Sequence, residues 1–231
     1  MKRLLIALLI FTLGITFTSA QEHGHPLSKS IVVVSTGFNM GTGFVVSYDG
    51  YFITCHHVVM DSDTVRLWAT EPAGAYTGRV VSRDPMYDWA LIKVDSNREW
   101  APLDVDLSNS MRVGDEVQAM GHPFGIGWLF TKGSLSSVKY EGNGLRFLYV
   151  DISNAAGSSG SPLMNSKSEV VGMIQMGAPG VGAIGIGVLD VYDVIVATIL
   201  NDRKLASRRA MLKAEMKRIE ASLQMLLDRE D

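Results

Sequence analysis

The sequence predicts an all-β protein, built from two packed six-stranded antiparallel β-barrels that are followed by a C-terminal α-helix. Three observations lead to this prediction. Between residues 30 and 200, short apolar runs alternate with turns rich in Gly, Asp and Asn, as in strands joined by tight turns. The runs fall into two groups without recurring helices, which disfavours a parallel α/β sheet. From Leu205 onward the chain contains neither Gly nor Pro, and good helix formers dominate.

The N-terminus has the pattern of a secretory signal peptide over residues 1–20. Lys2 and Arg3 precede an uncharged apolar run, and small residues end the segment at Ala20, where cleavage is expected. The run is short for a membrane span, which needs about 20 apolar residues, and an uncleaved anchor is the alternative. The sequence therefore predicts an exported protein, periplasmic or secreted, that has no membrane attachment after cleavage. Residues 21–29 are expected to form a flexible tail.

The first group of apolar runs predicts an N-terminal barrel over residues 30–106. Its expected strands are 31–34, 43–47, 51–54, 65–69, 78–82 and 90–94. The second group predicts a C-terminal barrel over residues 107–200, divided from the first where Asp, Asn and Ser cluster. Its expected strands are 116–120, 129–138, 145–152, 170–176 and 184–189.

The C-terminal helix is expected over residues 203–231. Four of its apolar residues recur every seven positions, namely Leu205, Leu212, Ile219 and Leu226. Met216 and Leu223 occupy the alternating position of the same seam, which Arg209 interrupts near its start. Two interpretations stay open: a coiled coil that makes a homo-oligomer, or a helix packed on its own domain.

Composition excludes several classes of function. The formal net charge of −3 gives no reason to expect a nucleic-acid partner. The single cysteine, Cys55, cannot form an internal disulfide. It stands beside His56 and His57, but one thiol lacks the paired spacing of a zinc site. We therefore interpret Cys55 as a buried structural residue and expect no metal.

Three residues form a candidate catalytic set. Ser159 lies in a tight turn, Ala-Gly-Ser-Ser-Gly-Ser-Pro-Leu, at residues 156–163. His57 and Asp88 both fall at strand ends in the first half of the chain. A serine hydroxyl needs a base to remove its proton, and a carboxylate must hold the histidine in the right tautomer. The order His, Asp, Ser is that of chymotrypsin-type enzymes, whereas α/β-hydrolases need Gly-x-Ser-x-Gly, whose last position is Ser161 here.

These segments resemble the trypsin-like serine proteases, specifically the HtrA/Deg-type protease domain. The resemblance covers about residues 30–200. The matching segments are Gly-Thr-Gly-Phe at 41–44, Asp-Gly-Tyr at 49–51, His-Val-Val at 57–59, Asp-Trp-Ala-Leu-Ile-Lys-Val at 88–94, Val-Gly-Asp at 113–115, Gly-His-Pro-Phe-Gly at 121–125 and Gly-Ser-Ser-Gly-Ser-Pro-Leu at 157–163. The resemblance implies a chymotrypsin-like fold and serine endopeptidase activity that needs no cofactor.

The sequence also departs from the family pattern. Cys55 replaces an Asn, and the register of the neighbouring Thr54 and Val58 selects His57, not His56, as the base. Ser161 replaces the second Gly of the nucleophile turn, as it does in bacterial glutamyl endopeptidases. The chain ends too soon for the PDZ domain that many HtrA proteins carry, so we expect a protease domain without one.

The resemblance also implies the roles of the site residues. Ser159 would be the nucleophile, His57 the general base and Asp88 its partner. The backbone N–H groups of Gly157 and Ser159 would form the oxyanion hole.

Substrate would be a protein or peptide, bound as an added strand along Ile174, Gln175 and Met176, with Ser153 in the pocket wall. The implied pocket base has no acid, although Asp151 lies near it, so we expect an apolar residue before the cleaved bond. Two alternatives differ in class: a protease-like binding protein whose site is never assembled, and a structural protein that acts through its C-terminal helix.

Overall fold

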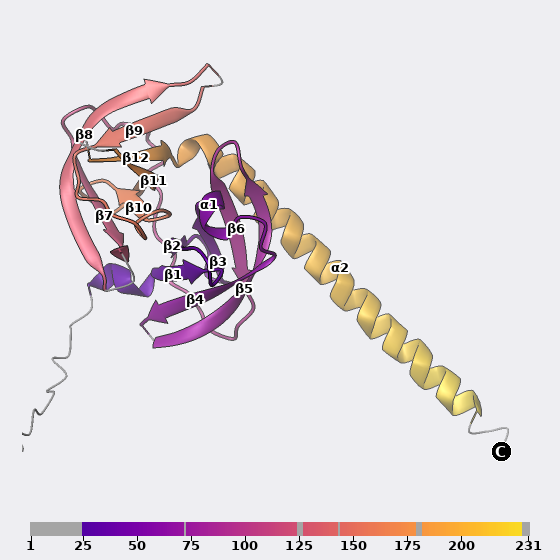
Figure 1. Cartoon of the computed structure of the whole chain (residues 1–231). Helices are drawn as coiled ribbons and strands as arrows, with labels where there is room; N and C mark the ends of the chain where they lie inside the picture. The colour runs from indigo at the N-terminus through magenta and orange to yellow at the C-terminus, as the bar shows by residue number, and fades with distance from the viewer. Residues whose placement is uncertain (1–24, 72, 124–126, 143, 179–181, 228–231) are drawn as a thin grey trace, which may run out of the picture.

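The computed structural model describes residues 25–227, except for residues 72, 124–126, 143 and 179–181. It contains two closed six-stranded antiparallel barrels and one long C-terminal helix (Figure 1). The predicted fold class is therefore confirmed. The predicted signal peptide, residues 1–20, lies outside the described residues. In the part of the chain that the structure describes, no helix is both long enough and apolar enough to cross a membrane.

The first barrel closes in the order β1-β2-β3-β6-β5-β4. Its strands are β1 Ile31–Ser35, β2 Met40–Val45, β3 Tyr51–Thr54, β4 Thr64–Thr70, β5 Ala73–Asp84 and β6 Trp89–Val94. β4 shows why the sequence forms such strands: Val65, Leu67 and Ala69 are buried, and each alternates with an exposed neighbour. A short helix, α1 His56–Val59, follows β3.

The second barrel closes in the order β10-β11-β12-β9-β8-β7. Its strands are β7 Glu116–Gly121, β8 Leu129–Tyr140, β9 Arg146–Val150, β10 Pro162–Met164, β11 Val170–Ala178 and β12 Gly182–Gly187. The strand absent from the sequence-based list is β10. It has three residues and begins at a proline, so neither its length nor its periodicity marks it as a strand.

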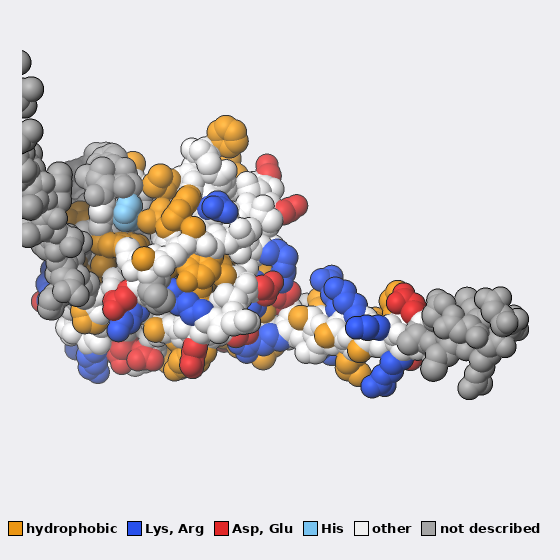
Figure 2. Space-filling model, turned by 90° about the horizontal axis from the view of Figure 1, so that it is seen from below, with side chains coloured by type: hydrophobic (Ala, Val, Ile, Leu, Met, Phe, Trp, Pro, Cys, Tyr) orange, Lys and Arg blue, Asp and Glu red, His pale blue; other side chains and the backbone are white. Residues whose placement is uncertain are grey.

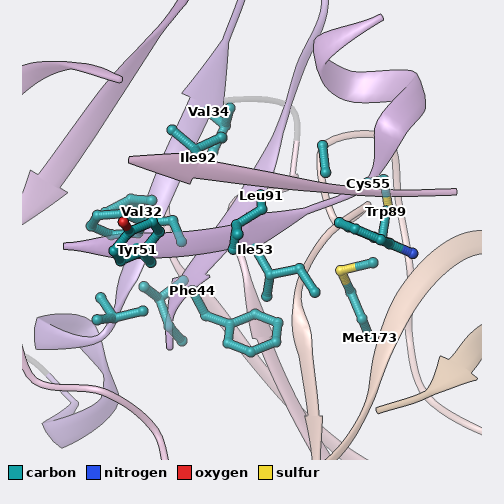
Figure 3. Close-up of a cluster of buried hydrophobic side chains, with 14 of the residues drawn as sticks. Val32, Val34, Phe44, Tyr51, Ile53, Cys55, Trp89, Leu91, Ile92 and Met173 are labelled. Carbon is teal, nitrogen blue, oxygen red and sulfur yellow. The ribbon is translucent and has the colours of Figure 1, made fainter. Parts of the chain in front are cut away.

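The barrel cores are packed with aliphatic and aromatic side chains. In the first barrel, Val32, Phe44, Ile53 and Leu91 point toward one another (Figure 3). Met173 of β11 reaches the same cluster from the second barrel and is 1% exposed. Because residues of both barrels share one apolar cluster, the interface between them is part of the core, which gives a site built there a rigid base.

The predicted N-terminal tail is ordered at its end. Residues Pro26–Lys29 form a 3-10 helix, η1, in which Leu27 and Ser28 are buried. The Thr70 hydroxyl donates a hydrogen bond to the Ser28 carbonyl, and the His25 ring stacks on Phe130 of the second barrel at 4.5 Å. Burial of Leu27 overrides the polar composition of the segment, so residues 25–29 belong to the fold rather than to a tail.

The C-terminal helix, α2 Leu189–Leu227, begins earlier than the sequence-based boundary at residue 203. Its first turns bury Val191, Ile195 and Ile199 at a spacing of four residues, so they pack on the barrels rather than pair as a strand. Asp190 accepts a hydrogen bond from the Arg146 backbone N–H (2.9 Å) and pairs with its guanidinium.

Polar contacts then fix the helix to the first barrel. Tyr51 donates its hydroxyl proton to Asp202 (2.8 Å), and Arg203 pairs with Asp49. Burial and the hydrogen bond to Asp202 raise the pKa of Tyr51 well above its usual value, so the phenol stays a donor. The proximal part of α2 is therefore packed on its own domain, ahead of the residues to which the two interpretations of the sequence apply.

One glycine allows the barrels to approach each other. Gly160 has a φ of +89°, and a Cβ built on it would lie 1.9 Å from the Thr42 carbonyl oxygen of β2. Neither this backbone conformation nor this spacing admits a larger residue.

Replacing Gly160 with Ala is therefore expected to lower the free energy of unfolding by about 4 kcal/mol, from left-handed strain and overpacking together. The matched control is Gly114→Ala, because Gly114 has a φ of +95° but nothing within 4 Å of the place where a Cβ would lie. We expect the control to cost about 1 to 2 kcal/mol. Urea unfolding of both variants measures the difference, and equal losses would contradict the role of close approach.

Candidate active site

His57 and Asp88 form a two-point contact beside the barrel interface. His57 lies in α1, directly after β3, and its Nδ1 is 2.8 Å from Asp88 Oδ2. The backbone N–H of His57 also donates to Asp88 Oδ1 at 2.9 Å. The carboxylate thus holds both the ring and the backbone of the histidine. With Nδ1 bonded to the carboxylate, Nε2 is the ring nitrogen left to accept a proton.

Asp88 is held in an uncommon backbone conformation. It is among the few non-glycine residues described with positive φ (50°), directly before β6. The preceding carbonyl, of Tyr87, accepts a hydrogen bond from the side-chain amide of Gln175 at 2.7 Å. Gln175 belongs to β11 of the second barrel and is 4% exposed. A residue of one barrel therefore fixes the peptide that carries the carboxylate of the other.

The turn before β10 carries Ser159 and is tied to the first barrel by Thr42. The Thr42 backbone N–H donates to the Ser159 carbonyl at 2.8 Å, and the Thr42 hydroxyl donates to the Gly157 carbonyl at 2.8 Å. The Gly160 N–H donates to the Ile174 carbonyl at 2.7 Å. Gly157 has a φ of +98°, which glycine adopts without strain. The turn is thus held from both sides of the interface.

The Ser159 hydroxyl donates a hydrogen bond to the Gln175 carbonyl at 3.0 Å. Among the hydrogen bonds of the described residues, none joins Ser159 to His57. The N–H groups of Gly157 and Ser159 likewise donate to no described partner. Two unpaired donors beside a serine on a glycine turn can bind the oxygen of a polarised carbonyl.

Cys55 lies beside the His57–Asp88 pair. Sγ of Cys55 and ligand atoms of the other two residues all lie within 4.8 Å of one another, an arrangement that could hold a metal. Burial raises the pKa of the Cys55 thiol well above its usual value, and the Asp88 charge adds to this. The thiol is therefore protonated and donates to the Ile174 carbonyl at 3.3 Å, which makes it a hydrogen-bond donor rather than a thiolate ligand.

The predicted substrate-binding residues divide into exposed and buried ones. Met176 is 54% exposed on β11, and Ser153 is exposed. Ile174 is buried and shares a cavity of about 10 Å³ with Ser153 and Ser161. The side chain of Gln175 faces Tyr87, so only its backbone is left for a bound peptide.

Two functional residues have weak sequence signals. Thr42 lies inside the Gly-Thr-Gly-Phe segment, but its bonds to the nucleophile turn depend on contact between the barrels. The side-chain role of Gln175 depends on the same contact. The position of Thr42 within a matching motif is the one sequence signal that could have drawn attention to it.

Comparison with known proteins identifies the family of this chain. The family model of the trypsin-like peptidase domain matches residues 41–173, which contain all three candidate catalytic residues. The chain belongs to the trypsin-like peptidase family. The resemblance predicted from the sequence motifs is thereby confirmed.

The chain is also similar to curated proteins that are described as serine proteases. It is 36% identical over 141 residues to a probable periplasmic serine endoprotease, DegP-like, of Pseudomonas putida, covering 58% of this chain and 28% of that protein. It is 35% identical over 157 residues to a protein of the same description from Chlamydia trachomatis, covering 64% and 30%. A probable serine protease, do-like, of Buchnera aphidicola is 31% identical over 154 residues, covering 64% and 32%. The chain is thus similar to DegP-like serine endoproteases, and it spans about 30% of the length of the curated relatives it matches.

Gln175 provides a test of how the barrels hold the peptidase site. Replacing Gln175 with Leu removes the donor to the Tyr87 carbonyl and leaves that acceptor without this bond beside Asp88. We expect a loss of about 2 kcal/mol in the free energy of unfolding, measured by urea denaturation.

The matched control is Gln118→Leu. Gln118 is also buried, but its amide donates to Glu116, whose side chain is 48% exposed and can turn to water. We expect the control to cost less than about 1 kcal/mol. A larger loss for Gln118→Leu than for Gln175→Leu would contradict the role given to Gln175.

Proposed function

We propose that this protein is a serine endopeptidase that hydrolyses peptide bonds through Ser159, His57 and Asp88. The observation that carries the proposal is the two-point contact between His57 and Asp88, opposite a nucleophile turn that Thr42 ties to the same barrel. The order of these residues along the chain and membership of the trypsin-like peptidase family support it.

The chemistry follows from the groups present. Ser159 Oγ attacks the substrate carbonyl carbon while its proton passes to His57 Nε2, giving a tetrahedral oxyanion. The N–H groups of Gly157 and Ser159 donate to that oxyanion, each worth about 3 kcal/mol of transition-state stabilisation. His57 then protonates the leaving amine, and an acyl group remains on Ser159. A water molecule, deprotonated by His57, releases the acid. Asp88 stabilises the charged ring and keeps its own negative charge throughout.

Substrate is proposed to be a protein or peptide that adds a strand along Ile174, Gln175 and Met176, with Ser153 beside the residue that precedes the cleaved bond. Because the cavity next to Ser153 is small and none of the residues that line it is charged, a small apolar side chain is the best match. Cleavage of a peptide library, read by mass spectrometry, tests this preference.

A second candidate is a protease-like protein that is latent until its site is assembled. The observation that favours it is the Ser159 hydroxyl, which donates to the Gln175 carbonyl rather than to His57. The two candidates therefore differ in the hydrogen-bond partner of this hydroxyl rather than in fold.

One experiment separates the two candidates. The purified chain is treated with a fluorescent fluorophosphonate, and cleavage of an unfolded protein such as casein is measured alongside. The peptidase proposal expects an adduct on Ser159 together with cleavage. An ordered protein that gives neither, even with peptide added, would overturn the peptidase proposal and leave the latent protein.

Export to the periplasm or the medium is part of the proposal. It rests on the signal pattern of residues 1–20 and on the word periplasmic in the names of the relatives. N-terminal sequencing of the exported protein is expected to begin at Gln21. Recovery of the intact N-terminus with the membrane fraction would instead indicate an uncleaved anchor.

A further inference from the structure

The distal part of α2 projects from the barrels as a single rod (Figure 1). Every side chain from Arg203 to Arg218 is exposed, and four of them are large and apolar. These are Leu205 (45% exposed), Met211 (73%), Leu212 (52%) and Met216 (59%). Space-filling representation shows apolar and basic side chains together on this rod (Figure 2). Most of the stability of a helix in a protein comes from packing an apolar face, and the described part of the chain leaves these four side chains uncovered.

The apolar residues of the rod follow a coiled-coil spacing. Leu205, Leu212 and Met216 are separated by seven and four residues, and with Arg209 counted they follow alternating steps of four and three, which brings them to one narrow stripe. The sequence continues the same spacing with Ile219, Leu223 and Leu226. These three side chains are not among those that the structure describes. A stripe this narrow fits one partner helix, and a second copy of this chain supplies a stripe of the same spacing.

A parallel pair of these helices would be opposed by charge. In a parallel pair, Arg209 occupies the seam and would face Arg209 of the second copy. The positions that flank the seam add two further conflicts. Arg208 would meet Lys213 of the other copy, and Glu215 would meet Glu220. Each of these last two contacts occurs twice because of the two-fold symmetry.

An antiparallel pair removes these conflicts. With Met216 beside Ile219 of the other copy, Lys213 of each chain flanks Glu220 of its partner, so two opposite-charge contacts form. Arg209 then faces Leu226, along which its stem can lie while its head reaches water. Within residues 209–226 the remaining flanking pair, Glu215 with Ser222, holds no like charges, and the like-charge pair of Arg208 with Arg229 falls outside this overlap.

We propose that α2 joins two copies of this chain in an antiparallel coiled coil over residues 209–226. The centre of the overlap lies about 28 Å along the helix from Ile199, where α2 leaves the barrel core, at 1.5 Å per residue. The two barrel domains therefore project from opposite ends of the coiled coil. This arrangement keeps each candidate active site within its own chain. The proposal concerns assembly and does not depend on the proposed proteolytic function.

A single charge reversal distinguishes the two orientations. Lys213→Glu puts a second carboxylate against Glu220 in the antiparallel pair, but places that carboxylate against Arg208 in the parallel pair. Sedimentation equilibrium of the chain lacking residues 1–20 measures the dimer dissociation constant. The antiparallel pair predicts a dissociation constant about tenfold higher for Lys213→Glu, with recovery when Glu220→Lys is added. The matched control is Lys217→Glu, which makes the same charge change outside the seam and flanks and is expected to leave the dissociation constant within about twofold.

Three results would overturn the proposal. Tighter association of Lys213→Glu would indicate the parallel pair. If the unmodified chain is a monomer at high micromolar concentration, a second copy of the chain is not the partner of this helix. Unchanged association in Leu212→Asp, a substitution at an exposed site that leaves the barrels untouched, would place the contact elsewhere on the molecule.

Discussion

Replacing Ser159 with Ala is expected to lower kcat/KM for peptide hydrolysis by about a million-fold, to the level left by binding and oxyanion stabilisation alone. The substitution removes the attacking oxygen and the hydrogen bond to the Gln175 carbonyl. The backbone bonds that shape the turn, from Thr42 to Ser159 and from Gly160 to Ile174, do not involve the hydroxyl. The variant should therefore fold normally and lose only the chemistry. Hydrolysis of a fluorogenic peptide measures the loss, and urea unfolding checks the fold.

The matched control is Ser158→Ala, in the adjacent position of the same turn. Ser158 is 8% exposed, and the hydrogen bonds that it makes within the described chain come from its backbone. We expect its activity to stay within about tenfold of the unmodified protein, because no step of the chemistry uses that hydroxyl. If Ser158→Ala loses activity while Ser159→Ala keeps it, the nucleophile has been assigned to the wrong serine.

The sequence predicted the fold class because its strands carry local signals. Regular burial, as in Val65, Leu67 and Ala69, can be read from alternation alone. β10 could not be predicted in the same way, since a three-residue strand has no period and is stabilised by its neighbours β7 and β11. The start of α2 is ambiguous for a related reason. Residues 184–195 are mostly apolar. Whether such a run forms a β-strand or an α-helix depends on the elements that it packs against.

The candidate site likewise has one part that the sequence predicts and one part that it does not. His57, Asp88 and Ser159 stand in motifs whose order and neighbours can be recognised from the sequence alone. The bonds that hold them could not be predicted, because they join residues far apart in the chain. Gln175 to Tyr87 spans 88 residues, and Thr42 to Gly157 spans 115. The hydrogen bond from the Ser159 hydroxyl to the Gln175 carbonyl is also not encoded by any motif.

Replacing Asp88 with Asn is expected to lower kcat by about 10,000-fold while leaving the fold almost unchanged. The amide can keep the backbone contact, since its oxygen still accepts from the His57 N–H. Its NH₂ group then faces Nδ1, where the carboxylate oxygen was, and donates to it. The ring must carry its proton on Nε2 instead, so it can no longer take one from Ser159. Asn also tolerates the positive φ of this position, so no new backbone strain arises.

The control for this last substitution is Asp84→Asn, four residues earlier. Asp84 Oδ1 accepts from the N–H groups of Met86 and Tyr87, and an amide oxygen can do the same. Both variants should unfold within about 1 kcal/mol of the unmodified protein, as expected when hydrogen bonds are exchanged rather than lost. Only Asp88→Asn should lose the fluorophosphonate adduct on Ser159, because only it disables the base. Retention of more than about a tenth of the activity in Asp88→Asn would mean that orientation of His57 comes from elsewhere. The contacts of the His57 N–H and of the Tyr87 carbonyl would then orient His57. In that case Gln175→Leu would lose more activity than Asp88→Asn.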